Sequence, residues 1–457
     1  MAKVQKKNEL AKKNSFMVVN PDAAGIDVSP KEMQVCVPED RARDNNRRFG
    51  VYTKDLREIT DWLKEVGVTT VAMESTGVYW IPIFSVLTEA GIDVILVNAR
   101  IVKNYSGKKT DMSDAQWLMM LHRYGLLKPC FQPENKVRDF RRLVRSRDTL
   151  VKSAAREVQH VQKAMEQMNL KLDNVFSDIL GKSGQSIIKA IIAGERDPKR
   201  LASLADRGCK KPREEIELSL QADWNDELVY EMSLYQDLYE FYQQKIREID
   251  AKADAILDEI CKAAPKAEGS LVRSRKKVNK KNSVSFDIEA QAYQIWGVNA
   301  MSIPGMSRIS LMKLVGELGA DFVEKFPDAD HFASWANLVP NNKISGGCLL
   351  SSRVPRKKNP AGIIFRQIAF TLSRSQSAMG DYFRKVQSRS GYMQAVVATG
   401  RKLAVTLYTM VARKTEYDES EYQKRKERAL RESADKLRLR LEALENKISK
   451  TMQYSNL

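Results

Sequence analysis

Four acidic residues in the first quarter of the chain have the types and spacing of a divalent-metal site. They are Asp27, in Gly-Ile-Asp-Val-Ser; Glu74, in Ala-Met-Glu-Ser-Thr-Gly; and the pair Asp111 and Asp114, in Asp-Met-Ser-Asp. Carboxylate oxygens are the ligands that Mg²⁺ and Mn²⁺ prefer. A pair of such ions can activate an attacking oxygen and stabilise a leaving oxygen during phosphodiester cleavage. These residues, called the four acids below, therefore predict a metal-dependent nuclease centre.

The sequence around the four acids indicates alternating strands and helices that could bring them together. Short apolar stretches predict strands at 25–28, 33–37, 49–53, 69–73 and 93–97, and longer patterns predict helices at 54–66, 82–90 and 114–121. Asp27 and Glu74 then lie on neighbouring strands. Asp111 and Asp114 are three residues apart at the opening of a helix, which points both side chains to one face. Residues 15–132 are expected to form one α/β domain.

Each acid also has an ordinary explanation as a helix cap or a solvated surface group, and singly that explanation is the stronger one. Their joint placement favours metal, because two strands and a helix carrying Asp, Glu and Asp-x-x-Asp in this order are the layout of the RNase H-like fold. The chain has only three His, at 122, 160 and 331, and five scattered Cys without a Cys-x-x-Cys. No imidazole or thiol cluster therefore competes for the metal, and the Cys usage is typical of a reduced cytosol.

The composition favours a nucleic-acid partner. The chain of 457 residues carries 76 Lys and Arg against 58 Asp and Glu, a formal net charge of +18, and such a surplus favours polyphosphates. The hydrophobic fraction of 43% is enough to bury several cores. The Lys-rich start has no apolar core of a signal peptide after it, and no uncharged run is long enough to span a bilayer. We expect a cytoplasmic protein with no membrane partner.

Two long heptad patterns follow the first domain. Apolar residues recur at alternate spacings of three and four from Val137 to Leu172, with only Arg147 breaking the seam, and again from Leu228 to Ile260. They predict a coiled-coil arm over 133–265. The two helices could pair within one chain as an antiparallel hairpin, or between chains as an oligomerisation arm.

The remainder divides by composition into three segments. Residues 266–300 read as a basic linker, whose cations could contact phosphates: Arg273, Arg275, Lys276 and Lys277. Residues 301–415 predict a C-terminal helical domain. Residues 416–457 carry a third heptad, from Leu430 to Ile448, and predict an added helical extension.

A second chemical site is indicated within the C-terminal domain. Ser345, followed by Gly346 and Gly347, places a hydroxyl on a loop that lacks β-carbons, where a DNA backbone can approach. Most Ser-Gly-Gly triplets are flexible connectors. The basic residues that follow favour a catalytic role, because cations could stabilise a transferring phosphoryl group: Arg353, Arg356, Lys357 and Lys358.

The combined motifs resemble those of the Piv-type DEDD transposases of bacterial insertion sequences, the "one-ten" family known for bridge-RNA-guided recombinases. The resemblance rests on the four acids, Gly-Lys-Ser-Gly and Ala-Gly-Glu-Arg-Asp-Pro in the helical middle, an Ile-Pro-Gly turn, and Leu-Val-Pro before Ser-Gly-Gly. It runs from about Val18 to about Thr415. The sequence departs from the family where Ile344 precedes the serine and Cys348 follows the glycines, so the basic residue beside the serine stays open among the four named above.

The resemblance implies a fold and a mechanism. The fold would be an N-terminal RuvC-like, RNase H-like nuclease domain with Mg²⁺ or Mn²⁺ at the four acids, a central antiparallel coiled coil, and a C-terminal helical transposase domain. Ser345 would be the nucleophile that forms a phosphoserine link to DNA. The two sites would combine across protomers of a homodimer or homotetramer, and a bridge RNA would pair with donor and target DNA.

Two other functions remain open on the residues alone. A structure-selective nuclease would resolve branched DNA at the metal centre by water attack and would need no serine. A basic coiled-coil scaffold would bind nucleic acid without catalysis, and the acids would then act as caps.

Overall fold

The computed structural model describes residues 17–75, 77–102, 105, 112–273, 282–355 and 358–454. The chain forms two compact units, Met1–Gln132 and Pro133–Leu457. Within the part that the structure describes, no helix combines the length and apolar character needed to cross a membrane.

The first unit is built on a mixed five-stranded sheet in the order β3-β2-β1-β4-β5. Its strands are β1 (Ala23–Val28), β2 (Met33–Cys36), β3 (Asn46–Phe49), β4 (Thr70–Glu74) and β5 (Asp93–Val97). The β2 strand pairs antiparallel with both β1 and β3, whereas β1, β4 and β5 run parallel. A three-stranded meander continued by parallel strands is consistent with an RNase H-like domain.

Helices cover both faces of this sheet, as the alternation of its side chains requires. Ile26 and Val28 of β1 share one apolar core with α2 (Thr53–Glu65) and α3 (Trp80–Glu89). On the other face, Ala72 of β4 packs with Leu118 and Leu121 of α5 (Asp114–Arg123). The short α4 (Ala99–Val102) follows β5. Successive residues of one strand therefore belong to different cores.

One strand prediction was wrong in its position. The expected strand at 49–53 lies instead at Asn46–Phe49, and residues 50–52 lead into α2. The reason is local, because the Asp55 carboxylate accepts a hydrogen bond from the backbone N–H of Tyr52 at 2.9 Å. A β-carbon on Gly50 would lie 2.1 Å from that carboxylate, so the capped start of α2 ends the strand there.

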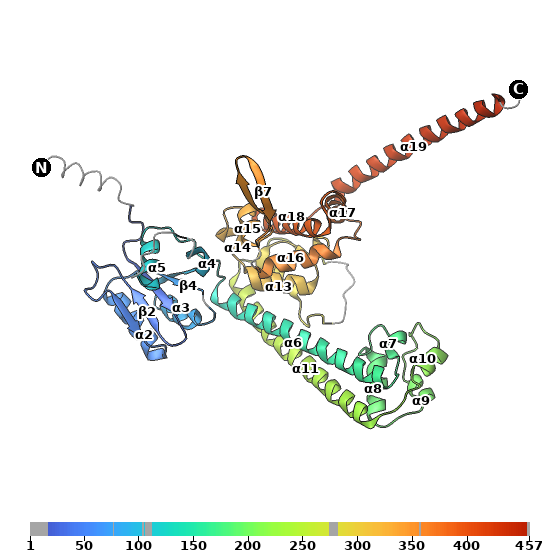
Figure 1. Ribbon diagram of the computed structural model, residues 1–457, viewed down its shortest axis with the longest axis horizontal. Coiled ribbons are helices and arrows are strands. Elements are labelled where there is room, and N and C mark those ends of the chain that lie inside the picture. The colour runs from blue at the N-terminus through green and yellow to red at the C-terminus, as the bar shows by residue number, and fades with distance from the viewer. Residues whose placement is uncertain are drawn as a thin grey trace. The chain divides into compact units, whose positions relative to one another are not determined.

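In the second unit, two long helices, α6 (Asn135–Gln167) and α11 (Asp226–Ala263), lie side by side (Figure 1). They run antiparallel, since Lys136 pairs with Glu259 at one end while His160 stacks on Tyr235 toward the other. The two heptad patterns thus pair within the chain. The far end carries small helices: α7 (Leu172–Val175), α8 (Lys182–Ile192), α9 (Pro198–Ser203) and α10 (Arg213–Ser219).

Arg147, the residue that interrupts the first heptad pattern, has a partner on the opposite helix. Its guanidinium donates to both carboxylate oxygens of Asp250, at 2.5 and 3.2 Å, and both side chains are nearly inaccessible to solvent. The same guanidinium donates to the backbone carbonyls of Asn282 and Ser283 at 3.2 and 3.1 Å. One buried cation therefore aligns the two long helices and holds the chain where it enters the C-terminal helices.

Replacing Arg147 with Ala is expected to destabilise the second unit by about 3–5 kcal/mol, because it leaves the Asp250 carboxylate buried without a counter-ion. Urea unfolding of the full chain measures the change. The control is the double variant Arg147→Met with Asp250→Leu, which removes both charges and is expected to unfold near the wild-type midpoint. A single variant as stable as wild type would contradict this role for the ion pair.

The C-terminal helices enclose an aromatic core. Phe322, Phe332, Phe365, Trp296 and Tyr408 contact one another with ring centroids 5.3–6.2 Å apart. The helices are α12 (Ile288–Trp296), the 3-10 turn η1 (Ala300–Ser302), α13 (Arg308–Leu318), α14 (Phe322–Lys325), α15 (Ala329–Trp335), α16 (Pro360–Thr371), α17 (Ala378–Ser390) and α18 (Tyr392–Arg413). The α12 helix lies in the stretch expected as a linker, and its Ile288 and Trp296 are fully buried.

Ion pairs join these helices to the base of α6. Arg145 donates to both oxygens of the Glu317 carboxylate on α13, each at 2.8 Å, and Lys313 pairs with Asp148. The last helix, α19 (Ser420–Tyr454), begins against α17, where Tyr422 and Lys426 both contact Asp381. Burial opposes ionisation of Asp381, but hydrogen bonds from Lys426, Tyr422 and Arg384 outweigh it and lower the pKa of this carboxyl to about 2.

Candidate active site

Asp27 and Glu74 lie at equivalent positions on two neighbouring strands of the first unit's sheet. The parallel pairing of β1 with β4 sets Gly25 beside Ala72 and Ile26 beside Met73, so one further step sets Asp27 beside Glu74. Residues in register on neighbouring strands point to the same face. Both side chains are partly exposed, at the carboxyl ends of their strands. Two carboxylates therefore share one edge and one face of the sheet.

The face that these carboxylates share is the one covered by α5. Gly25 lies two residues before Asp27 and faces α5 so closely that an added β-carbon would lie 2.3 Å from the carbonyl oxygen of Ala115. Ala72, two residues before Glu74, packs on the same helix. Because side chains two apart on a strand share a face, Asp27 and Glu74 point to the side where α5 begins. Asp114 is the first residue of that helix.

Gly25 is what lets α5 approach the sheet. Replacing Gly25 with Ala is expected to destabilise the first unit by about 3 kcal/mol, the upper end of overpacking effects, because the two nearest atoms belong to the backbone of α5. Those atoms are the Ala115 carbonyl oxygen and the Met119 nitrogen, which would lie 2.3 and 2.4 Å from the new β-carbon. Urea unfolding and DNA cleavage should both report the change. Gly208→Ala is the control, since its β-carbon would meet only Asp206 at 3.6 Å.

The donor set fits a hard cation in its chemistry, although it is not assembled among the described residues. Asp111 lies outside them, and within the ranges that the structure describes no group of three or more His, Cys, Asp or Glu is close enough to hold a metal ion. Asp27, Glu74 and Asp114 all contribute carboxylate oxygens, and Asp114 is solvent-exposed. Carboxylates at two strand ends and a helix start fit Mg²⁺ or Mn²⁺ better than a metal that prefers nitrogen or sulfur.

The two nearby side chains that could bind a softer metal, Cys36 and His122, are both buried. Cys36 packs against Ala115 and Met119, and burial, with the adjacent Glu39 carboxylate, raises the pKa of its thiol to about 12. His122 stands at the other end of α5, where burial lowers its pKa against the opposing effect of Asp93. Its Nε2 lies 2.9 Å from the Thr70 hydroxyl. Both side chains serve packing.

Ser345 occupies the end of a strand, where the sequence led us to expect a loop. It closes β6 (Asn341–Ser345), which pairs antiparallel with β7 (Cys348–Arg353), so that Ser345 faces Cys348 across a two-residue turn. Gly346 and Gly347 form that turn with φ of 55° and 78°, the backbone region that glycine enters without strain. A β-carbon at either glycine would meet nothing within 4 Å. The serine thus stands beside an open turn.

The two helices that flank this hairpin in sequence, α15 and α16, are joined to each other. Asn359, just before α16, donates from Nδ2 to the Trp335 carbonyl at the end of α15, at 2.8 Å. Gly362 approaches the Ala336 carbonyl so closely that a β-carbon would lie 1.9 Å from that oxygen. Most residues of β6 and β7 are exposed. The strands of the hairpin are therefore open to solvent, while the helices before and after it hold each other in place.

The structure describes only some of the basic residues that were predicted to contact nucleic acid. Arg275, Lys276, Lys277, Arg356 and Lys357 lie outside the described residues. Arg273 is described and pairs with Asp287 at 2.6 Å, while Arg353 and Lys358 are exposed. Arg353 faces Asn341 at the base of the hairpin. Its backbone is therefore about 13 Å from that of Ser345, at about 3.3 Å per residue.

Three polar residues near the two sites were missed by the sequence reasoning. Lys343 lies two residues before Ser345 on the exposed β6 strand and is a nearer cation than Arg353. Gln34 faces Asp27 directly across the β1–β2 pair, and Asn46 lies on the next strand. The available signal for Lys343 was its closeness in sequence to Ser345. Gln34 and Asn46 carry no such signal, because their placement depends on strand register.

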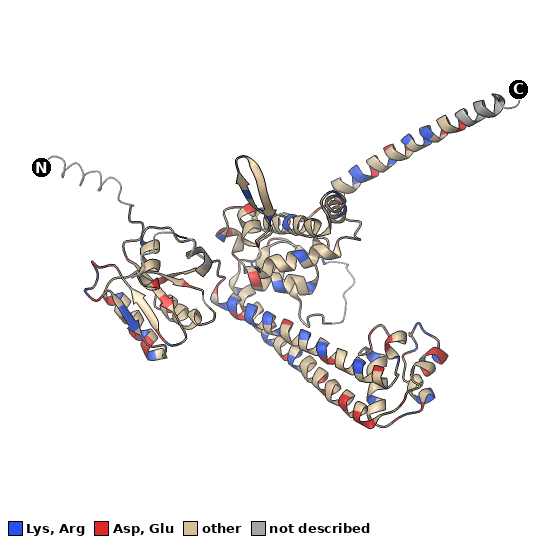
Figure 2. Cartoon of the chain, viewed as in Figure 1, with Lys and Arg blue, Asp and Glu red and all other residues tan. Residues whose placement is uncertain are grey.

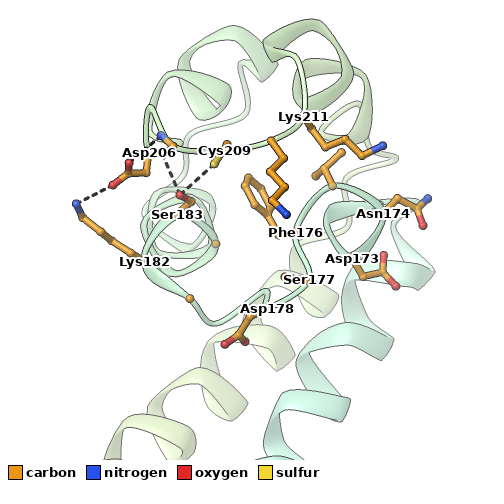
Figure 3. A pocket seen from close by; sticks show the side chains of 15 residues that line it. Asp173, Asn174, Phe176, Ser177, Asp178, Lys182, Ser183, Asp206, Cys209 and Lys211 are labelled. Carbon is orange, nitrogen blue, oxygen red and sulfur yellow. Dashed lines mark hydrogen bonds and ion pairs between the residues drawn. The ribbon is translucent and has the colours of Figure 1, made fainter. Parts of the chain in front are cut away.

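The Gly-Lys-Ser-Gly motif builds the tip of the helical arm, beside a cavity of about 670 Å³ (Figure 3). The Ser183 hydroxyl accepts from the Asp206 N–H at 2.9 Å and lies 3.6 Å from the Cys209 sulfur, and Lys182 pairs with Asp206. A β-carbon on Gly184 would lie 2.0 Å from the Ile179 carbonyl oxygen. These interactions account for the motif as packing and turn chemistry.

The Ala-Gly-Glu-Arg-Asp-Pro motif joins two helices of the same tip. Gly194 has a φ of 98°, and the Glu195 carboxylate accepts from the backbone N–H groups of Arg196 and Asp197. Asp197 then caps α9, with Pro198 as the first helical residue. The Arg196 guanidinium lies 4.6 Å from the centre of the Trp224 ring. The motif specifies a turn.

Comparison with known families gives two matches along the chain. Residues 24–170 match the family of the IS110 DEDD transposases, and residues 298–384 match the IS116/IS110/IS902 transposase family. The first match spans the four acids and the second spans Ser345. No curated protein matches the chain significantly. The two matches together cover just over half of the sequence, and they agree with the resemblance of its motifs. The chain therefore belongs to the IS110-type transposases.

Proposed function

We propose that this transposase cuts and rejoins donor and target DNA through a covalent link between Ser345 and a DNA phosphate, with divalent metal bound at the four acids. The observation that carries the proposal is the presence on one chain of both family matches, one spanning the acids and the other the serine. The carboxylates of Asp27 and Glu74, at adjacent strand ends, and the exposed turn beside Ser345 support it.

The ligands would be Asp27, Glu74, Asp111 and Asp114, and the ion Mg²⁺ or Mn²⁺. When bound, it would supply Lewis acidity that offsets the negative charge developing on a phosphate. The protein's own contribution is to present carboxylates from two strands and a helix. Gly25 determines how closely that helix approaches, and Cys36 keeps its thiol protonated and outside the donor set.

The proposed serine step exchanges one phosphate ester for another. A bond forms between Ser345 Oγ and phosphorus while the bond from phosphorus to the sugar oxygen breaks, and the hydroxyl proton passes to the leaving sugar oxygen. Attack by the sugar hydroxyl of a second DNA end reverses the exchange, frees Ser345 and joins the new ends. The bonds broken and formed are of one kind, so no energy-rich cofactor is required. Lys343 is the cation best placed along the strand to assist.

We further propose that the cations of the second unit hold DNA and a guiding bridge RNA by their backbones. The first half of α6 is rich in Arg and Lys, which Figure 2 shows along its length. Arg142 and Lys152 expose 66% and 77% of their side chains. Exposed cations read phosphates and duplex shape without reading sequence, which base pairing with the RNA would provide. This activity would take place in the bacterial cytoplasm, at the nucleoid.

Self-association as a dimer or tetramer is part of the proposal. The α11 helix uses one face against α6, while Tyr230, Leu234, Leu238 and Phe241 on another face remain 42–65% exposed. The described part of α19 exposes a leucine stripe in heptad spacing: Leu430, Leu437, Leu441 and Leu444. Exposed apolar stripes on long helices favour a partner helix. A second copy of the chain would then supply the serine or the acids that one copy needs.

The experiment that tests this function is recombination in vitro. Purified full-length protein is incubated with Mg²⁺, the RNA transcribed from the element's non-coding end, and supercoiled donor and target DNA, and junctions are detected by amplification. The proposal expects junctions only when all components are present. Cleavage of branched DNA without joining and without a protein adduct would favour the resolvase alternative, and binding without any strand cleavage would favour the scaffold.

A further inference from the structure

A line of polar side chains connects the strand beside Asp27 to the start of α5. Gln34 on β2 donates from Nε2 to the Oδ1 of Asn46 on β3, at 3.0 Å. Asn46 donates in turn from Nδ2 to the Ser113 hydroxyl, at 3.3 Å. Ser113 is the N-cap of α5 and directly precedes Asp114. Gln34 is thus linked through Asn46 to Ser113, and Ser113 is the residue next to a proposed ligand.

These residues lie on the face of the sheet that α5 covers. Cys36 packs against Ala115 and Met119 of the helix, and Gln34 precedes it by two residues on the same strand. Asn46 faces Cys36 across the β2–β3 pair, and Gln34 faces Asp27 across the β1–β2 pair. Asp27, Gln34 and Asn46 therefore share one face. The line of hydrogen bonds begins beside one proposed ligand and ends beside another.

The cap of α5 is complete without Asn46. The Ser113 hydroxyl accepts from the Gln116 N–H at 3.2 Å, and the Gln116 side chain accepts from the Ser113 N–H at 3.0 Å. This capping box satisfies the helix end by itself. A cap does not require the hydrogen bond from Asn46. That bond instead fixes the position of the first turn of α5 over the sheet.

We propose that Gln34 and Asn46 are positioning residues for the metal centre, holding Asp114 in place relative to Asp27 through Ser113. The inference rests on the proposed function, because it assigns these residues to the metal ligands named there. Metal binding depends on ligand placement within about 0.5 Å, and partners that orient ligands change metal affinity by about 10–100-fold. Without the bond from Asn46, the first turn of α5 keeps its cap and loses its attachment to the sheet.

The test is calorimetric titration of the full-length protein with Mn²⁺ in the absence of nucleic acid. Asn46→Ala is expected to bind Mn²⁺ about 10–100-fold more weakly than wild type, while thermal unfolding changes little. Glu58→Ala, an exposed position on α2, is the matched control and should bind as wild type does. Raising the Mn²⁺ concentration should restore DNA cleavage to Asn46→Ala, whereas Asp114→Ala should stay inactive at every concentration.

Two further measurements separate the possible failures. In a double-mutant cycle, Asn46→Ala with Ser113→Ala should bind Mn²⁺ no more weakly than the weaker single variant, because both break the same connection. Amide hydrogen exchange of the first turn of α5 should quicken in Asn46→Ala but not in Glu58→Ala. Unchanged exchange together with wild-type Mn²⁺ affinity would overturn the positioning role. Wild-type Mn²⁺ affinity in Asp114→Ala, with quickened exchange in Asn46→Ala, would instead overturn the metal site while leaving the connection established.

Discussion

Strand cleavage is expected to fall by about a thousandfold when Asp27, Glu74 or Asp114 is replaced by Ala, a loss of the size seen when one stabiliser of transition-state charge is removed. Asp27 and Glu74 occupy adjacent strand ends and Asp114 begins the helix over the same face. Each substitution removes one anionic ligand while leaving the apolar cores intact. The measurement is single-turnover cleavage of labelled DNA at saturating protein and Mg²⁺.

Two controls make this result specific. Glu89→Gln removes an exposed carboxylate at the end of α3 and should cleave as wild type does. Gel-shift affinity for DNA should change little in the three Ala variants, since the loss concerns catalysis. Cleavage within tenfold of wild type by Glu74→Ala would place the metal ligands elsewhere.

Covalent attachment to DNA is expected to vanish entirely in Ser345→Ala. No other hydroxyl of the described hairpin shares its position, because Ser351 and Ser352 face Lys343 and Asn342 further along, away from the Gly346–Gly347 turn. The substitution removes one oxygen from an exposed strand end, so folding and nucleic-acid binding should be preserved. Denaturing electrophoresis with labelled DNA would show the wild-type adduct as a slow, protease-sensitive band.

Ser351→Ala and Ser352→Ala are the matched controls for that experiment. Both alter a hydroxyl of β7 in the same hairpin and should leave the adduct in place. An adduct that persists in Ser345→Ala and disappears in one of these variants would mean that the nucleophile is on the opposite strand.

The elements that carry the acids could be predicted because their signals are local. The apolar runs around Asp27 and Glu74 predicted strands that the structure places at β1 and β4, and the pattern from Asp114 predicted α5. Their convergence depends on the pairing of β1 with β4 and on the contact of Gly25 with Ala115. Both join residues far apart in sequence. The sequence therefore suggested convergence only through the layout of a known fold.

The hairpin that carries Ser345 was not expected from the sequence. Its strands show no clean alternation of apolar and polar residues, since Ile344, Leu349 and Leu350 all remain 58–69% exposed. A register shift between Lys343 and Ile344 also breaks the two-residue period. Gly-Gly between two short runs was the usable signal, because two positive-φ residues form the tightest hairpin turn.

Arg147 illustrates a different limit. In the heptad pattern it appears only as a break, and its meaning depends on Asp250, 103 residues later, and on two carbonyls further still. Nothing in its neighbourhood distinguishes a buried ion pair from an interruption of the helix. Long-range pairing of this kind became visible only once the antiparallel alignment of α6 and α11 was known.

The most direct test of the central claim, that the acids and Ser345 serve one reaction, is to identify the amino acid joined to DNA. The adduct is trapped with Mg²⁺, digested with nuclease and protease, and its modified peptide is read by mass spectrometry. The account predicts a phosphorylated Ser345 that is absent without Mg²⁺ and absent in Glu74→Ala. A modified residue other than Ser345, or an adduct that forms equally well in Glu74→Ala, would contradict it.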